Sequence, residues 1–255
     1  MAVADFSLDG KVAIVTGGSR GIGRAIALAL AEAGAGVAIA ARKVESLEES
    51  LEAVKAVGGK AIAVPTNVRD MDALQNLVET TRRELGRVDI LVNNAATNPV
   101  FGPVANIDER AWDAIMNTNV KSMFFLSTLV RAAIKEHGEG GSIVNVSSTG
   151  GVRVSQGLGG YSISKAAVIM LTAVCAKEWG TDGIRVNCIA PGLIQTEFSR
   201  ALWENEGILK NATTQSALRR IGQPEEMAGA VVYFASAASS FTTGQTLILD
   251  GGQLA

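Results

Sequence analysis

Short, almost wholly apolar runs recur along the chain and predict the strands of a buried sheet. Most of these runs show no alternation of apolar and polar residues, which is typical of parallel strands that are covered on both faces. The runs lie at 12–16, 36–41, 60–64, 88–92, 142–146, 184–189 and 246–249.

The segments between these runs have helical periodicity. Apolar residues recur every three or four positions between Leu47 and Val57, and again between Met71 and Leu85. Such alternation of strands and helices uses right-handed crossovers and gives a doubly wound α/β sheet. The chain has 255 residues and no linker-like segment. We therefore predict one domain over residues 1–255, with a seven-stranded parallel sheet and helices on both faces.

Composition and charge argue against several classes of function. Hydrophobic residues make up 47% of the chain and the formal net charge is −2, so there is no basic stripe of the kind that binds nucleic acid. The apolar stretch 166–176 is too short to cross a bilayer and predicts a buried helix, and the N-terminus lacks a secretory signal. We therefore expect no membrane partner.

The cysteines and the histidine add little chemistry. Cys175 and Cys188 have no metal-binding spacing and are expected to be buried thiols in a reducing cytoplasm. A single histidine, His137, can form neither a metal site nor a serine–histidine relay, so hydrolase chemistry is not expected. These residues favour a cytoplasmic protein without a metal.

A glycine-rich turn follows the first predicted strand. Its glycines are spaced as Gly17-x-x-x-Gly21-x-Gly23, and they open a helix that we expect to run from about Gly21 to Ala33. Glycine permits positive φ and a close approach of the backbone, so a pyrophosphate can bind the free N–H groups of the helix N-terminus. This strand–turn–helix context is that of a dinucleotide-binding turn.

Three polar residues further along can transfer a proton. Tyr161 and Lys165 are four residues apart, which places them on one face of a helix, and Ser148 lies upstream. The ammonium of Lys165 would lower the pKa of Tyr161 and make it a usable acid or base. Ser148 would hydrogen-bond the reacting oxygen. Ser147 is its rival, but the spacing to Tyr161 favours Ser148.

These motifs resemble those of a known family. TGGSRGIG, NNAA, NTNVKS, Ser148, YSISK and APG occur in the order and spacing of the short-chain dehydrogenase/reductase family, from about Lys11 to Gly252. The segments NNAATNP, APGLIQTEFSRALW and RRIGQPEEMAG also resemble the carbonyl and retinal reductase branch. The 3-oxoacyl-carrier-protein reductases have similar motifs. The resemblance implies a single-domain Rossmann fold and a nicotinamide dinucleotide as cofactor.

The resemblance also implies roles for individual residues. Tyr161 would protonate the oxygen of a carbonyl that receives hydride, and Asn119 would position a water that links Lys165 to solvent. Thr196 and the backbone of Ile194 would anchor the nicotinamide carboxamide. The catalytic residues would be Asn119, Ser148, Tyr161 and Lys165. The cofactor groove would be lined by Gly17, Ser19, Arg20, Gly21, Ile22, Gly23, Arg42, Asn67, Val68, Asn94, Tyr161, Lys165, Pro191, Gly192, Ile194 and Thr196.

The end of the second strand predicts which nicotinamide cofactor is used. Ala41 stands where the resemblance would place an NAD-selecting aspartate; Arg42 follows it, and Arg20 projects from the glycine turn. Two guanidiniums without a carboxylate suit a 2′-phosphate, so we predict NADPH/NADP+. The chain departs from the family at Asn67, where an adenine-facing aspartate is usual, and at Ala96, where glycine is usual.

The segment 193–222 interrupts the strand–helix alternation and, by the resemblance, forms a lid over the substrate. An apolar substrate pocket is predicted from Ser148, Val154, Leu158, Tyr161, Leu193, Phe198 and Trp203. These features favour the reduction of a small ketone or aldehyde to an alcohol. Reduction of a 3-oxoacyl chain on an acyl carrier protein is the alternative, and a non-catalytic dinucleotide sensor is a second one. The resemblance further implies a homotetramer, built through the helices that carry Asn119 and Tyr161 and through the last strand.

Overall fold

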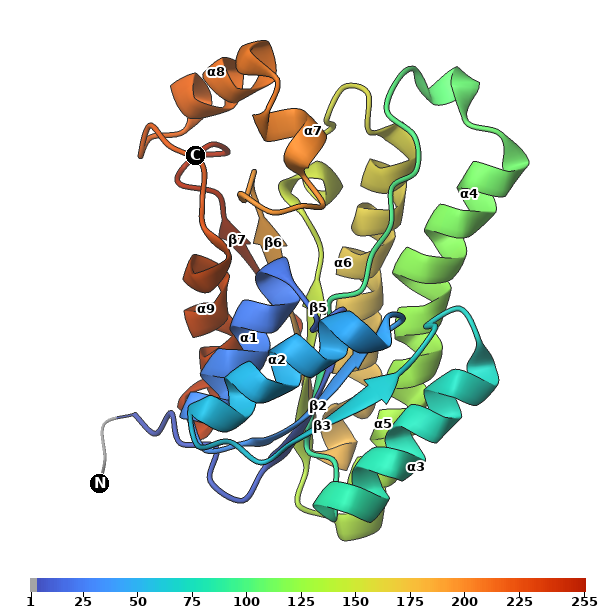
Figure 1. Ribbon diagram of the computed structural model, residues 1–255, viewed down its shortest axis with the longest axis vertical. Coiled ribbons are helices and arrows are strands. Elements are labelled where there is room, and N and C mark those ends of the chain that lie inside the picture. Colours follow the sequence, from blue (N-terminus) through green and yellow to red (C-terminus); the bar gives the residue numbers. More distant parts are fainter. Residues whose placement is uncertain (1–3) are drawn as a thin grey trace.

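The computed structural model describes residues 4–255, and its centre is a seven-stranded parallel sheet (Figure 1). Its strands are β1 (Val12–Thr16), β2 (Gly36–Ala41), β3 (Ala61–Pro65), β4 (Ile90–Asn93), β5 (Gly141–Val146), β6 (Ile184–Pro191) and β7 (Thr246–Leu249). They lie in the order β3-β2-β1-β4-β5-β6-β7. Every predicted strand is confirmed, and its ends differ from the prediction by two residues at most.

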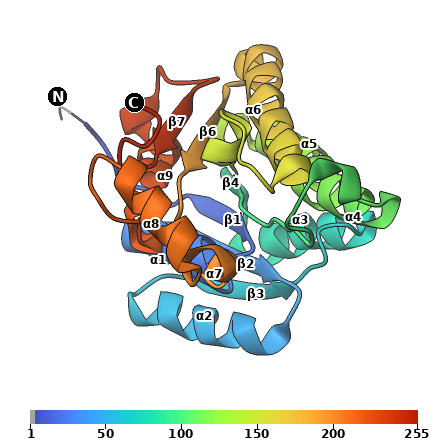
Figure 2. The same cartoon turned by 90° about the horizontal axis from the view of Figure 1, so that it is seen from above.

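Helices cover both faces of this sheet (Figures 1 and 2). One layer consists of α1 (Gly21–Glu32), α2 (Val44–Ala56) and α9 (Ala228–Ala235), and the other contains α3 (Met71–Leu85), α5 (Ser122–His137) and α6 (Gly159–Trp179). Each layer buries an apolar stripe against the strands, which removes apolar surface from water on both faces. The doubly wound Rossmann fold is therefore confirmed.

The order of the strands opens a crevice at the carboxyl ends of the strands, next to β1. β1 pairs with β2 on one side and with β4 on the other, so the connections run in opposite directions from this point. In open α/β sheets, such a reversal opens a ligand site beyond the carboxyl ends of the strands.

A chain of buried amides ties the sheet to α6. Asn93 Nδ2 donates a hydrogen bond to Asn145 Oδ1 (2.9 Å), and Asn145 Nδ2 donates to Thr172 Oγ1 (2.9 Å). These side chains come from β4, β5 and α6, and all three are buried. Because buried amides are costly when unpaired, this chain fixes α6, the helix that carries Tyr161 and Lys165, against the sheet.

The α6 helix is buried on one face only. The stretch from Gly159 to Asp182 is long and apolar enough to cross a membrane by length and composition alone. Val168 and Cys175 pack into the interior, whereas Met170 and Val174 are exposed. The predicted burial of 166–176 is thus correct for the sheet-facing residues and wrong for the opposite face.

The lid segment, residues 193–222, leaves the sheet after β6. Its helices α7 (Arg200–Trp203) and α8 (Glu206–Gln215) lie over the carboxyl ends of the strands (Figure 2). The base of the lid segment is closed, because Gln195 N donates to Gly222 O (2.9 Å) and Gly222 N donates to Leu193 O (3.0 Å). Its two ends are therefore held together where they meet the domain.

At the opposite edge of the sheet, His137 has partners that were not anticipated. It lies with Asp89 and Glu139 in a cluster whose side-chain ligand atoms are within 4.8 Å of one another. Arg87 pairs with both carboxylates, at 2.6 Å from Asp89 and 2.7 Å from Glu139. The carboxylates of Asp89 and Glu139 are thus paired with the guanidinium of Arg87. This ion-pair network joins β4 to the end of α5.

Candidate active site

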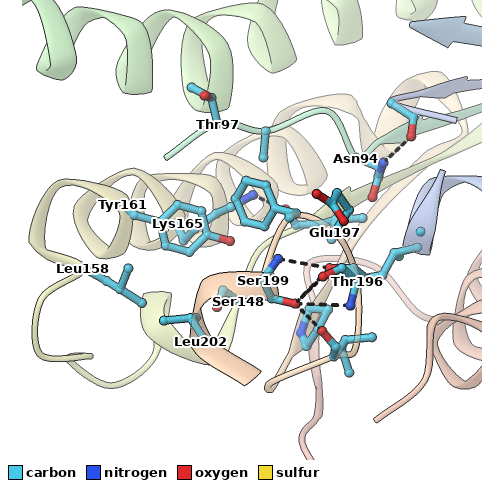
Figure 3. A pocket seen from close by; sticks show the side chains of 18 of the residues that line it. Asn94, Thr97, Ser148, Leu158, Tyr161, Lys165, Thr196, Glu197, Ser199 and Leu202 are labelled. Carbon is cyan, nitrogen blue, oxygen red and sulfur yellow. Dashed lines mark hydrogen bonds between the residues drawn. The ribbon is translucent and has the colours of Figure 1, made fainter. Parts of the chain in front are cut away.

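The main cleft lies at the carboxyl ends of the strands and has a volume of about 1370 Å³. Its walls include residues that lie one or two positions after the ends of four strands: Gly17 after β1, Asn94 after β4, Ser148 after β5 and Gly192 after β6. Figure 3 shows the part of the cleft between Asn94 and the lid segment. All predicted cofactor residues line this one cleft.

The glycine turn needs its glycines for two different reasons. Gly17 and Gly21 have φ values of 64° and 53°, in the left-handed region that side chains disfavour. A Cβ on Gly23 would lie 2.2 Å from Gly17 O and 2.4 Å from the Asn94 side-chain nitrogen. Gly23 therefore lets α1 pack directly against the turn.

Several hydrogen bonds connect this turn to the residues at the end of β4. Asn94 Nδ2 donates to Thr16 O (2.9 Å) and to Gly17 O (3.1 Å), while Asn94 N and Ala95 N donate to Thr16 Oγ1 (3.0 and 3.1 Å). Asn94 thus holds the backbone of the turn. Thr16 was not among the predicted site residues, although a threonine at the end of a buried strand has a hydroxyl that must find a partner.

The N-terminus of α1 fits an anionic group. Arg20 is the N-cap residue and its side chain makes no capping hydrogen bond, and the first turn contains no acidic residue. The first N–H groups of a helix have no partner within the helix, and the helix dipole favours negative charge there. This end of the cleft therefore suits the pyrophosphate of a dinucleotide.

Positive charge gathers at one end of the cleft. Arg20, Arg42, Lys43 and Arg69 all line it there, next to the ends of β1, β2 and β3. Among residues 4–255, none of these four side chains is in an ion pair with a carboxylate. Asn67 stands where the family usually has an adenine-facing aspartate. Its Oδ1 accepts a hydrogen bond from Arg69 N at 3.3 Å.

Ser148, Tyr161 and Lys165 meet at the other end of the cleft (Figure 3). Tyr161 and Lys165 lie on the first turns of α6, and the Lys165 Nζ is 5.5 Å from the centre of the Tyr161 ring. Lys165 is buried and donates from Nζ to Val146 O (2.7 Å). The Tyr161 ring also lies 6.0 Å from that of Phe198 in the lid segment.

The pKa of Tyr161 differs from the prediction. Burial raises it to about 12, and a hydrogen bond with Ser148 opposes that rise. Burial also lowers the pKa of Lys165 to about 8. The lysine was expected to dominate, but its ammonium binds the Val146 carbonyl and desolvation has the larger effect. Tyr161 is therefore protonated at neutral pH, which suits a proton donor.

The two neighbouring serines have different environments. Ser147 Oγ is buried and donates to Lys165 O (2.7 Å), so it holds α6 in place. Ser148 faces the cleft, where its Oγ accepts from Gly150 N (3.1 Å) and its hydroxyl also hydrogen-bonds the phenol of Tyr161. This arrangement favours Ser148 over Ser147 as the residue that contacts substrate.

Asn119 lies behind the wall of the cleft. It sits in a π-helical turn (Asn117–Lys121) between α4 (Glu109–Met116) and α5, and it is fully buried. Its Oδ1 accepts from Thr97 N (2.8 Å), and its Nδ2 donates to Thr97 O (3.0 Å) and Ser164 Oγ (3.0 Å). These bonds fix the amide within the protein, and the role of Asn119 in positioning a water stays a prediction.

The predicted substrate residues divide into two groups. Leu158, Leu193 and Phe198 line the cleft, together with Leu202, which sequence analysis missed. The prediction is wrong for Val154 and Trp203, which are not among the lining residues. Val154 is 86% exposed, because it lies in a loop that turns outward. The Trp203 indole instead points to the backbone, where Nε1 donates to Thr196 O (2.8 Å).

Comparisons with known proteins agree with this geometry. Residues 17–253 match a family profile described as Enoyl-(Acyl carrier protein) reductase. Dehydrogenase/reductase SDR family member 4 of Oryctolagus cuniculus is 41% identical over 245 residues, which is 96% of this chain and 94% of the relative.

Two solved structures have the same fold over their whole length. A short-chain type dehydrogenase/reductase from Mycobacterium marinum is 37% identical, with a TM-score of 0.92, and the match covers 98% of this chain and 97% of the other. A gluconate 5-dehydrogenase from Burkholderia cenocepacia, in complex with NADP and tartrate, is 33% identical, with a TM-score of 0.94 and coverage of 100% and 99%.

Proposed function

Because this chain belongs to the short-chain dehydrogenase/reductase family, it is an oxidoreductase acting on CH–OH or C=O groups, and we propose that it reduces a neutral ketone or aldehyde with NADPH. The observation that carries this proposal is the distribution of charge along the cleft. Four cations line the end near β2, whereas the substrate end has only Lys165 and Glu197 among its charged side chains.

Tyr161 and Ser148 are the groups that act on the carbonyl oxygen. The bound dinucleotide would supply hydride to the carbonyl carbon. Tyr161, protonated at neutral pH, donates its proton to the oxygen as negative charge develops there, and Ser148 donates a hydrogen bond to the same oxygen. Lys165 is held by Val146 beside the ring of Tyr161, where its ammonium stabilises the phenolate that remains.

The choice of NADPH rests on Arg20 and Arg42. Both guanidiniums are exposed at the cleft wall, and a 2′-phosphate can accept paired, charge-assisted hydrogen bonds from such groups. Lys43 and Arg69 add positive charge next to them. The Burkholderia relative, which was solved with NADP, supports the same choice.

The substrate end favours an uncharged molecule. Leu158, Leu193, Phe198 and Leu202 supply apolar surface, and the one exposed charge among the lining residues there is the carboxylate of Glu197. The Glu197 carboxylate would repel a substrate carboxylate, although Arg200 lies 3.6 Å from it and offsets part of its charge, and Lys165 is buried with Val146 as its partner. These features support an uncharged substrate over a sugar acid.

An acyl carrier protein is a weaker candidate as partner. Such an acidic protein would need free basic residues at the rim of the pocket. Arg131 pairs with Asp182 at the far end of α6 (2.7 Å), Arg200 pairs with Glu204 (2.7 Å), and Arg220 pairs with Glu226. These three arginines are therefore neutralised by carboxylates, whereas Arg153 and Arg219 form no ion pair with a carboxylate among residues 4–255.

A matched pair of ketones tests the substrate class. We expect ethyl benzoylformate, an uncharged keto ester, to give a kcat/KM at least about tenfold higher than benzoylformate, its carboxylate, with NADPH oxidation followed by absorbance. Glu197→Gln should reduce the ratio of the kcat/KM for the ester to that for the carboxylate. Turnover of benzoylformate as fast as that of the ester would contradict the proposal.

Two further substrates separate the alternatives. Turnover of an acetoacetyl thioester alone would favour the acyl-carrier-protein alternative. Binding of NADPH without turnover of any carbonyl, including an aromatic aldehyde, would favour the dinucleotide sensor.

Two exposed apolar faces support a homotetramer. Ile163, Met170 and Val174 form a stripe on α6, and Phe124 and Phe125 are exposed on α5. A second face lies at the edge strand β7, where Phe241, Leu247 and Ile248 are exposed. Monomeric proteins rarely expose apolar patches of this kind.

The subunit contact can be tested by light scattering after gel filtration. We expect a mass four times the 26.4 kDa of one chain, and we expect Met170→Lys to reduce it because a charge would be buried in the contact. Val57→Lys is the control, since Val57 is exposed but lies at the end of α2, on neither face. A wild-type protein that elutes as a monomer would contradict the assembly.

A further inference from the structure

Trp203 joins the lid segment to the nicotinamide end of the cleft. It is the last residue of α7, and its indole N–H donates to Thr196 O at 2.8 Å. The side chain is only partly buried, and the neighbouring Leu202 lines the cleft while Trp203 does not. The indole therefore holds the backbone of residue 196 and leaves contact with the substrate to Leu202.

Ser199 completes this connection from the residue just before α7. Its Oγ donates to Ile194 O and lies 2.9 Å from Thr196 Oγ1, and Ser199 N donates to Thr196 Oγ1 (3.3 Å). Figure 3 shows these bonds clustered between Ser199 and Thr196. Two side chains of the lid segment thus bind the two residues that are expected to hold the nicotinamide carboxamide.

The loop that contains Thr196 has little other support. It lies between the end of β6 at Pro191 and the start of α7 at Arg200. Among residues 4–255, its backbone is bonded to distant parts of the chain only near its base, where Gly192 N donates to Leu249 O (3.0 Å) and Leu193 and Gln195 bond with Gly222, and none of these bonds reaches beyond Gln195. The position of the Thr196 peptide is therefore determined largely by Ser199 and Trp203.

We propose that Trp203 is a positioning residue that couples the lid segment to cofactor binding. With its N–H on Thr196 O, α7 places the Thr196 hydroxyl and Leu202 in the cleft as one unit. A dinucleotide that contacts Thr196 then stabilises α7 in this position, and α7 in turn holds Leu202 in the substrate wall. This inference rests on the proposed use of a nicotinamide cofactor and adds a residue outside the cleft to its machinery.

Comparison of two ligands tests this coupling. NADPH would reach the Thr196 loop, whereas adenosine 2′,5′-bisphosphate would occupy only the end lined by Arg20 and Arg42. We expect Trp203→Phe, which keeps an aromatic ring and loses the N–H, to weaken NADPH binding by about tenfold in a fluorescence titration. Binding of the bisphosphate, measured by calorimetry, should be unchanged.

Controls separate this effect from general damage. The chain has three tryptophans, and Trp112→Phe on α4, outside the cleft, should change neither affinity. Ser199→Ala removes the second support of the loop and should give the same selective loss, so it serves as the test if Trp203→Phe does not fold. Equal weakening of both ligands, or no weakening of NADPH, would overturn the coupling.

The same binding measurements show whether the cofactor proposal fails independently of the role of Trp203. A wild-type protein that binds neither NADPH nor the bisphosphate would contradict the use of NADPH, whatever Trp203 does. The same comparison would then be made with NADH and ADP. A selective loss of NADH affinity in Trp203→Phe would support the coupling, and its absence would overturn it.

Discussion

Replacement of Tyr161 by phenylalanine is expected to reduce kcat for carbonyl reduction by about a thousandfold, in the range typical for loss of a general acid. The phenol lies beside Ser148 in the cleft and carries a proton at neutral pH, because burial raises its pKa to about 12, further above neutrality than its ordinary value. Phenylalanine keeps the ring that lies 6.0 Å from that of Phe198, so the dissociation constant for NADPH should change little.

The second tyrosine of the chain provides the matched control. Tyr233 lies on α9, where its hydroxyl is 3.0 Å from Thr242 Oγ1, and it does not line the cleft. Tyr233→Phe removes the same atom and should leave kcat unchanged. Stopped-flow measurement of a single turnover would separate the chemical step from product release. If Tyr161→Phe kept the wild-type rate in that experiment, the assigned role of Tyr161 would be wrong.

Exchange of Arg42 for aspartate should reverse the cofactor preference. The substitution removes a charge-assisted partner of the 2′-phosphate and introduces a carboxylate that repels it but can accept from ribose hydroxyls. We expect the ratio of kcat/KM for NADPH to that for NADH to fall by about a hundredfold, since hydrogen bonds to charged groups contribute roughly 1.5–3 kcal/mol.

Two further variants serve as controls for the Arg42→Asp experiment. Arg83→Asp changes the net charge by the same amount on α3, away from the cleft, and should leave the ratio unchanged. Arg42→Ala should lower NADPH use without improving NADH use, because it adds no acceptor. An unchanged ratio in Arg42→Asp would mean that the phosphate is bound by other residues, or that the chain does not prefer NADPH.

The strands were predictable because of how they are covered. β1 is buried at all five positions, so no polar residue interrupts it, and its apolar run has clear ends. The last strand was found by the same reasoning, although it lies at the edge of the sheet and is partly exposed. Such local patterns do not depend on distant packing.

The site was predictable in part for a similar reason. Gly17, Asn94 and Ser148 each follow a parallel strand, and the fold brings such positions to one edge of the sheet. The orientation of Trp203 was not predictable, because its N–H finds Thr196 O only after the lid segment folds back on itself. Val154 lies in an irregular loop, where no periodicity reveals which side faces the cleft.

The pKa values of Tyr161 and Lys165 show a further limit. Spacing places the two residues on one face of a helix, but it does not reveal that Val146 O binds the ammonium or how much water reaches the phenol. Burial determines the direction of both shifts, and burial is a property of the folded chain.

The bonds that Asn94 makes to Thr16 and Gly17 have a consequence for the thermodynamics of association. They are formed entirely within the protein, so the glycine turn has its shape before a dinucleotide arrives. Conformational entropy that a mobile loop would lose on binding has already been lost during folding. The pyrophosphate of a cofactor would therefore meet a preorganised turn, whereas binding of a 2′-phosphate would still have to order the exposed side chains of Arg20 and Arg42.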